Sequence, residues 1–128
     1  MRTIKFRGKR RDNGKWIEGS LILNPEYEHP LIGEYYNETE DGHPISVWRE
    51  YEVIPETVGQ FTGHTDSTQK ETYEGDIIGR TSIPDRVIYW DVNGFYTRKT
   101  QGIGTTPLRV DEFDVVIGNI HDNPELLQ

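Results

Sequence analysis

Apolar and polar residues alternate over short stretches near the start of the chain. Residues 3–7 and 16–23 show the period-two pattern of half-buried strands, and Asn13-Gly14 lies between them. Asn-Gly is typical of a type I′ turn, because that turn needs φ above 0° at both central positions. The pattern therefore predicts a β-hairpin, with Gly19 as a candidate bulge in its second strand.

Short strands recur in the second half of the chain. Runs at residues 76–80, 86–90, 95–99 and 113–120 predict strands, with a weaker one at 108–110, and Asn93-Gly94 predicts another hairpin turn. Four or five such strands with small connections favour a small SH3-like β-barrel or a strongly bent sheet, because curling removes free sheet edges.

The stretch at residues 24–52 is less regular, because Asn24-Pro25 and His29-Pro30 interrupt it. Residues 31–36 predict a short strand and residues 45–53 its return. We expect the acidic segment at 37–44 to be a long, mobile loop between them.

Residues 59–80 are the stretch around which the chain is organised. An apolar run ends near Gly63, a polar segment follows, and Gly75-Asp76 precedes a new apolar run. Glycine takes φ above 0° without a Cβ penalty and aspartate accepts nearby backbone N–H groups, so Gly75-Asp76 predicts a turn. We expect an N-terminal β-hairpin subdomain with the acidic loop at residues 1–60 and the barrel at 61–128, or one compact unit of both.

The chain ends in a pattern that predicts one short helix at residues 122–127. Asp122-Asn123 supplies a cap, Pro124 fits the first turn, and Glu125 lies near the positive helix end. We expect the two leucines that follow to dock on the barrel. The residues assigned to structural turns are Gly63, Gly75, Asp76, Asn93, Gly94, Asn119, Asp122 and Pro124.

Composition narrows the class of protein. Apolar residues make up only 33% of the chain, so we expect its three Trp, seven Tyr and four Phe to supply most of the core. The absence of cysteine excludes a disulfide framework and a thiolate zinc site. With no long apolar run and a polar, charged N-terminus, the chain is expected to be a soluble protein of the cytoplasm.

Charge is distributed unevenly within the net −8. Residues 1–15 carry seven Lys and Arg against one Asp, whereas the remainder carries seven basic and 21 acidic residues. We expect the basic hairpin to lie against acidic surface of its own chain or of a neighbouring subunit. The alternative is nucleic-acid binding through Arg7, Arg10 and Arg11, which the acidic remainder opposes.

Catalytic chemistry has one weak candidate, the loop that carries His64 and Asp66 near Asp76. An imidazole with carboxylates can hold a metal ion, but the spacing matches no defined template. We expect Asp76 to hold the turn and Asp66 to cap a loop instead. No serine has the glycine context of an exposed nucleophile. Gly102-x-Gly104 lacks the strand-to-helix setting of a dinucleotide loop, so we expect no cofactor.

Aromatic residues flank the Asn93-Gly94 turn, and strand alternation sends half of them outward. Trp90 and Tyr96 are therefore candidates for stacking on bases or gripping a peptide. The alternative is that one residue of each neighbouring pair, including Tyr89 and Phe95, belongs to the core.

Two signatures resemble the YopX family of phage and prophage proteins. One is Gln60-x-Thr62-Gly63, a spaced Asp66, then the run at residues 73–77; the other is the run at 117–127. His64 and Gln69 depart from the family pattern, which commonly has Leu and Gly at these positions. The resemblance implies a mainly β protein with an SH3-like barrel, encoded by a phage or prophage, and it implies no biochemical activity.

The leading hypothesis is a non-enzymatic binding or assembly module in the cytoplasm of a bacterial host, with a protein as partner, either a second copy or a phage or host protein. A nucleic-acid-associated accessory protein that uses the basic hairpin is the alternative. A metal-assisted hydrolase at His64, Asp66 and Asp76 is the third hypothesis.

Overall fold

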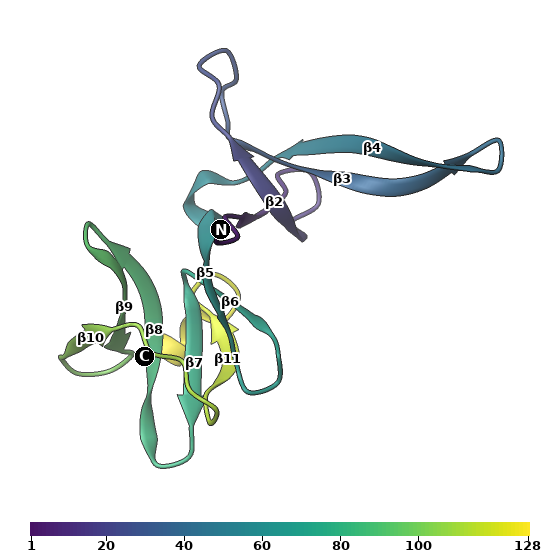
Figure 1. Ribbon diagram of the computed structural model, residues 1–128. Helices are drawn as coiled ribbons and strands as arrows, with labels where there is room; N and C mark the ends of the chain where they lie inside the picture. The colour runs from purple at the N-terminus through teal and green to yellow at the C-terminus, as the bar shows by residue number, and fades with distance from the viewer. The chain divides into compact units, whose positions relative to one another are not determined.

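The computed structural model describes all 128 residues as two compact units of antiparallel β-structure (Figure 1). One unit is Ile4–Gln60, and the other is Phe61–Gln128 together with Met1–Thr3. Strands dominate both units, so the mainly β prediction is confirmed. No helix in the chain is long and apolar enough to cross a membrane.

The N-terminal unit is a sheet in the order β4-β3-β2-β1-β5. Its elements are β1 (Phe6–Lys9), β2 (Trp16–Ile22), β3 (Leu31–Glu40), β4 (His43–Glu52), the 3₁₀ helix η1 (Pro55–Thr57) and the first two residues of β5 (Gly59–Thr65). Ile32 and Val53 are buried at its centre, and the Thr57 hydroxyl accepts the backbone N–H of Lys9 at 2.9 Å.

The opening hairpin is confirmed, but its turn differs from the type I′ turn predicted. Of Asn13 and Gly14, only Gly14 has positive φ, at 71°. The Gly14 N–H donates to the Arg10 carbonyl at 2.9 Å, and the Arg10 N–H donates to the Lys15 carbonyl at 2.9 Å. The loop is therefore longer than two residues, and glycine supplies its single left-handed position.

The acidic segment at residues 37–44 is not a long loop, and that prediction was wrong. β3 and β4 pair in register from Leu31↔Glu52 to Glu40↔His43, and only Asp41 and Gly42 connect them. Their φ values are 50° and 79°, the two positive angles that a type I′ turn requires. The Asp-Gly turn signal thus outweighed the acidic composition around it.

The C-terminal unit contains a five-stranded sheet in the order β10-β9-β8-β7-β11 and the β5–β6 pair, with which the six-stranded order β4-β3-β2-β1-β5-β6 ends. Its elements are the rest of β5, β6 (Glu71–Tyr73), β7 (Asp76–Arg80), β8 (Ile83–Asp91), β9 (Gly94–Lys99), β10 (Thr105–Pro107), β11 (Val115–Asn119) and the 3₁₀ helix η2 (Pro124–Leu127).

The SH3-like barrel is not confirmed, because β10 and β11 are the two ends of an open strand order. The weak strand expected at 108–110 was also misplaced, since β10 ends at Pro107. The β-branched pair Thr105-Thr106 forms the ladder with β9 instead, and Leu108 contributes a single backbone bond to Phe95 at 2.9 Å.

The expectation of an aromatic core was wrong. The buried apolar residues are Leu31, Ile32, Val53, Tyr73, Ile77, Ile78, Val87 and Ile88. Most other aromatic residues lie at the surface or half-buried, where rings on adjacent strands contact one another. Cross-strand pairing stabilises such rings without full burial, so aromatic content did not locate the core.

The C-terminal residues form a single 3₁₀ turn, so the expected short helix is reduced to Pro124–Leu127. Asn123 at its N-terminus makes no side-chain cap; its side-chain oxygen accepts the Asn119 N–H at 3.1 Å instead. Leu126 lies close to Gly118 of β11, where an added Cβ would be only 3.0 Å from the Leu126 Cδ1 atom.

Candidate functional site

The outer part of the β3–β4 hairpin, residues 34–50, has no third strand beside it; we call it the outer ribbon. β2 pairs with β3 only between Ile22↔Leu31 and Ser20↔Gly33, and β4 is the last strand in the order. Figure 1 shows β3 and β4 continuing side by side well beyond β2. A two-stranded ribbon of this kind is marginal in water unless its side chains support it.

One face of the outer ribbon carries an exposed aromatic pair. Tyr35 and Trp48 are direct cross-strand partners whose ring centroids lie 5.0 Å apart in an edge-to-face arrangement. They remain 68% and 39% exposed. The Trp48 indole N–H donates to the Glu50 carboxylate at 3.0 Å, which fixes the ring over the strand. The result is a preformed apolar surface with a polar rim.

The opposite face supports the ribbon. Tyr36 and Val47 are cross-strand partners, and the Arg49 guanidinium lies 5.7 Å from the Tyr36 ring centroid. Arg49 also forms an ion pair with Glu38 of the neighbouring strand. Half-buried apolar and paired charged side chains on this face leave the aromatic pair available on the other.

Two further properties define what the outer ribbon can bind. It carries five Asp and Glu residues against one Arg, so its field is negative. The outer edge of β4 has no strand partner along the outer ribbon; the Glu52 carbonyl at the end of β4 accepts the Arg11 N–H at 3.0 Å. Unpaired backbone donors and acceptors therefore run along this edge. An extended chain can add to such an edge.

The basic residues of the opening hairpin already contact their own unit. Arg10 donates to the Asp12 carboxylate at 2.9 and 2.6 Å, and its guanidinium carbon lies 3.7 Å from the Tyr51 ring centroid. The Arg10 hydrogen bond lowers the pKa of the Asp12 carboxyl. Arg11 lies 3.7 Å from the Glu52 carboxylate, and Arg7 is 9% exposed with its guanidinium 4.7 Å from the Trp16 ring.

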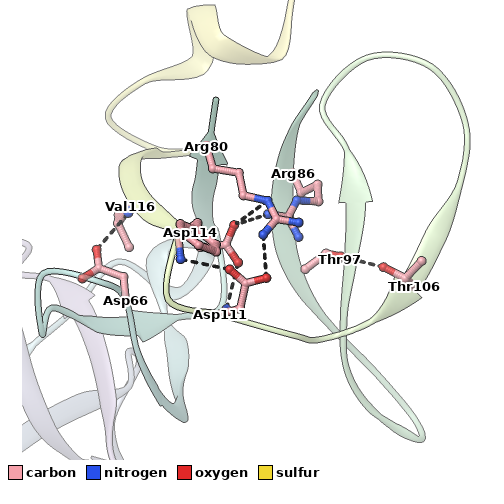
Figure 2. A network of polar contacts seen from close by, with 9 residues as sticks. Asp66, Arg80, Arg86, Thr97, Thr106, Asp111, Asp114 and Val116 are labelled. Atoms are coloured by element: carbon pink, nitrogen blue, oxygen red, sulfur yellow. Dashed lines mark hydrogen bonds and ion pairs between the residues drawn. The ribbon is translucent and has the colours of Figure 1, made fainter. Parts of the chain in front are cut away.

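Asp66 is a buried structural acceptor. One carboxylate oxygen accepts the N–H and hydroxyl of Thr68 at 2.8 and 2.7 Å and the Lys70 N–H at 3.0 Å, and the other accepts the Val116 N–H at 2.9 Å. Burial raises the pKa of Asp66, but these bonds outweigh it, so the net pKa lies below the usual 3.8. Asp66 ties the β5–β6 loop to β11 (Figure 2).

His64 and Asp76, the other residues of the proposed hydrolytic site, do not form a cluster with Asp66. Asp76 is buried and accepts the Tyr73 N–H at 2.7 Å, whereas His64 is exposed. No group of three or more His, Cys, Asp and Glu side chains is placed to hold a metal ion. Gly75, beside Asp76, has φ 93°, and its backbone bonds Ile88 at 2.8 Å and Ile120 at 2.9 Å.

The remaining turn residues lie at bends of the backbone. Gly63 has φ 91° at an irregularity in the β5–β6 register, and Gly94 has φ 130° after the Val92-Asn93 connection. The Asn119 side-chain oxygen accepts the N–H groups of His121 and Asp122 at 3.0 and 2.9 Å, and Pro124 opens η2.

The aromatic candidates near the β8–β9 turn form two cross-strand pairs. Trp90 and Phe95 have ring centroids 4.9 Å apart, and Tyr89 and Tyr96 have centroids 6.0 Å apart. Trp90 is half exposed, and Tyr96 is half-buried. The pairs belong to opposite faces of the two strands, so Trp90 and Tyr96 do not form one binding surface.

A polar network in the C-terminal unit was not anticipated from the sequence. Arg80 donates to Asp111 at 2.6 Å, and Arg86 pairs with the fully buried Asp114 (Figure 2). Asp114 also accepts the Asp111 N–H at 3.0 Å. The hydrogen bond from the Phe113 N–H lowers the pKa of Asp111. Partial burial raises this pKa, and the contact with Arg80 lowers it further.

The sequence gives little indication of this polar network. Asp111 and Asp114 are three residues apart just before an apolar strand, a spacing typical of a loop that bonds its own backbone. Arg80 ends β7 and Arg86 lies within β8, so only the strand pairing brings these four side chains together.

Comparisons with known proteins agree with this architecture. The family model described as YopX protein matches residues 5–128, nearly the whole chain. The crystal structure of protein EF1440 from Enterococcus faecalis matches with a TM-score of 0.59 and 19% identity over 100% of each chain, a likeness that concerns the fold alone. No curated protein matches the chain.

Proposed function

The chain belongs to the YopX family, and on that premise we propose that it is a non-enzymatic binding module whose outer ribbon takes up a basic, extended segment of a partner protein. We assign this role to the cytoplasm of a bacterial cell that carries the phage or prophage. The carrying observation is the combination of an unpartnered β4 edge with the exposed Tyr35–Trp48 pair.

Each property of the ribbon contributes a separate element of recognition. The β4 backbone offers hydrogen bonds to an added strand, which gives affinity with little sequence preference. Trp48 lies on β4 itself and offers a large, rigid apolar surface to a side chain of that strand. The ribbon has five carboxylates and one Arg, and this negative charge selects a positively charged segment and speeds its association.

The nucleic-acid alternative has less support. Arg10 and Arg11 lie against Asp12, Tyr51 and Glu52 of their own unit, so binding phosphate would require breaking those contacts. This arrangement favours the role first expected for the basic hairpin, in which its charges neutralise acidic surface of the same chain. The hydrolase hypothesis has no residue cluster that favours it.

A designed peptide pair tests the proposal. A peptide of alternating Lys and Val supplies a basic strand, and one of alternating Glu and Val supplies its acidic counterpart. We expect backbone amide resonances of β4 to shift on titration with the Lys peptide only, with an affinity that falls as salt rises. N-methylation of alternate peptide bonds removes the strand hydrogen bonds and should abolish the shifts.

Two tryptophan variants locate the surface. Trp48→Ala should weaken binding of the Lys peptide about tenfold or more, because large aromatic anchors dominate such contacts. Trp90→Ala removes an exposed tryptophan from the other unit and should leave binding unchanged. Equal binding of both peptides, or shifts away from β3 and β4, would contradict the proposed site.

A further inference from the structure

We propose that a small cavity beside the polar network of the C-terminal unit binds the phosphate group of a small organic phosphate. The cavity measures about 270 Å³ and is lined by Arg86, Thr97, Lys99, Gly104, Thr105 and Thr106. Two of these residues are cationic, three carry hydroxyls, and none is acidic. The proposal is independent of the outer ribbon.

Strand pairing places the two cations together. Arg86 of β8 and Lys99 of β9 are direct cross-strand partners, so their side chains leave the same face of the sheet. Like charges in this arrangement repel and destabilise a sheet unless something neutralises them. Asp114 offsets the charge of Arg86, and an anion beside Lys99 would offset the charge that remains.

The protein neutralises only part of this charge. Asp111 and Asp114 balance Arg80 and Arg86, but no carboxylate lies within ion-pairing distance of the Lys99 ammonium. Arg86 is held by its terminal nitrogen at Asp114, whereas its buried Nε–H has no acceptor in the protein. The cavity wall thus has one uncompensated positive charge, that of Lys99, beside the Arg86 guanidinium, whose charge Asp114 offsets.

Hydroxyl groups complete the donor set. Thr97 is 2% exposed, and its hydroxyl lies 3.0 Å from the Thr106 hydroxyl across the β9–β10 ladder (Figure 2). In such a pair only one hydroxyl hydrogen is used between the two oxygens, which leaves the other free to donate. Gly104, with φ 130°, leaves that side of the cavity without a side chain.

These donors match a phosphate better than a carboxylate. The Lys99 ammonium and the Thr97 hydroxyl come from β9, and the Arg86 guanidinium comes from β8. A tetrahedral phosphate offers oxygens in three or four directions, whereas a carboxylate offers two in one plane. The threonine methyls and the Lys99 methylenes supply apolar wall for the organic part.

Titrations with inorganic phosphate, phenyl phosphate and benzoate, followed by backbone amide resonances, test the site. We expect phenyl phosphate to shift the amides of Thr97, Lys99 and residues 104–106, inorganic phosphate to shift the same amides more weakly, and benzoate to act weakest. Shifts scattered over the chain, shifts for no phosphate compound, or benzoate binding as tightly as phenyl phosphate would each overturn the proposal.

A matched pair of variants separates this site from general electrostatic attraction. Lys99→Gln removes the uncompensated charge and should weaken phenyl phosphate binding roughly 5–10-fold, the usual effect of one charge-assisted contact. Arg98→Gln removes the same charge from the next residue, which lies on the other face of β9 with its guanidinium 5.7 Å from the Tyr89 ring, and should leave affinity unchanged.

A third variant tests the hydroxyl. Thr97→Val keeps the shape of a buried side chain, and we expect it to weaken phenyl phosphate binding while leaving the fold intact, as judged by amide resonances away from the cavity. Equal effects of Lys99→Gln and Arg98→Gln, or unchanged affinity in Thr97→Val, would show that the cavity does not bind phosphate in this way.

Discussion

At the scale of single residues, buried carboxylates hold loops of the C-terminal unit in place. Asp66 accepts three bonds from the loop that follows it and one from β11, although its own sequence context suggested only a local cap. Four donors converging on one carboxylate compensate the cost of burying its charge. Removing the charge therefore affects two segments that lie fifty residues apart in sequence.

Asp66→Asn tests this role. The amide nitrogen of Asn cannot accept the Val116 N–H, so we expect the variant to lose about 1–3 kcal/mol in free energy of unfolding at pH 7, the cost of an unsatisfied buried donor. Urea unfolding followed by circular dichroism measures it. An unchanged midpoint would show that the Val116 bond contributes nothing to folding.

The pH dependence has a defined sign. The pKa of Asp66 is lowered in the folded state, so the folded protein binds its proton less readily than the unfolded chain does. Its stabilisation is present above the unfolded pKa of about 3.8 and is lost as pH falls through the lower folded pKa. The difference between wild type and Asp66→Asn should therefore shrink in acid.

Residue identity predicted turns better than it predicted contacts. Asp76 was expected to hold a turn and Asp66 to cap a loop, and both accept backbone N–H groups near them in sequence. The bond from Val116 to Asp66 depends on strand pairing, which no local pattern encodes.

At the scale of elements, glycine and tryptophan shape the β3–β4 hairpin together. A Cβ added to Gly33 would lie 2.3 Å from the Trp48 ring, so the indole occupies the space that a side chain at this position would fill. Gly33 is buried and pairs with Glu50, two residues from Trp48 on the neighbouring strand. The aromatic surface of the outer ribbon thus depends on the absence of a side chain in β3.

Gly33→Ala should displace the Trp48 ring and lower the free energy of unfolding by about 1–3 kcal/mol, the usual cost of overpacking. The Gly33→Ala/Trp48→Ala double variant should lose less than the two single changes added together, because removing the indole removes the clash. Chemical denaturation of the four proteins measures this coupling. Strict additivity would mean that the ring moves aside without cost.

Strand positions were predictable where alternation and turn residues agreed. The Asp76–Arg80 strand matches the predicted range. The β8–β9 hairpin forms as predicted, but its two-residue connection is Val92-Asn93 rather than Asn93-Gly94. The outer ribbon was missed because the four acidic residues Glu34, Glu38, Glu40 and Asp41 suggested a long loop, although Asp41-Gly42 is itself a hairpin signal. A barrel was predicted where the sheet is open, because the number of strands alone does not determine whether the last strand pairs with the first.

At the scale of the whole molecule, the uneven charge of the sequence is partly resolved within the N-terminal unit. Arg10 and Arg11 pair with acidic residues and with the Tyr51 ring, which leaves less of the basic segment available to an external polyanion. Surface charge of this kind affects association and solubility more than it affects the fold.

The Arg10→Gln/Arg11→Gln variant tests which role dominates. We expect a lower midpoint of thermal unfolding, because the variant loses the Asp12, Glu52 and Tyr51 contacts, and no change in DNA or RNA retention in filter-binding assays at two salt concentrations. A sizing column run beside the assays detects any change in assembly. Tight, salt-sensitive nucleic-acid binding by the wild type, abolished in a variant that melts normally, would reverse our order of hypotheses.

The strand order of the C-terminal unit also determines when β7 gains its two partner strands during synthesis. The N-terminal unit has all its residues once Gln60 is made, but β7 pairs with β8 on one side and with β11 on the other. β8 ends at Asp91 and β11 ends at Asn119, so at about 5–20 residues per second the synthesis of β11 is complete about 1–6 s after that of β8. During that interval β7, with its apolar residues Ile77 and Ile78, is a nascent strand with one unprotected edge. We therefore expect a chaperone that acts on the growing polypeptide to bind at β7.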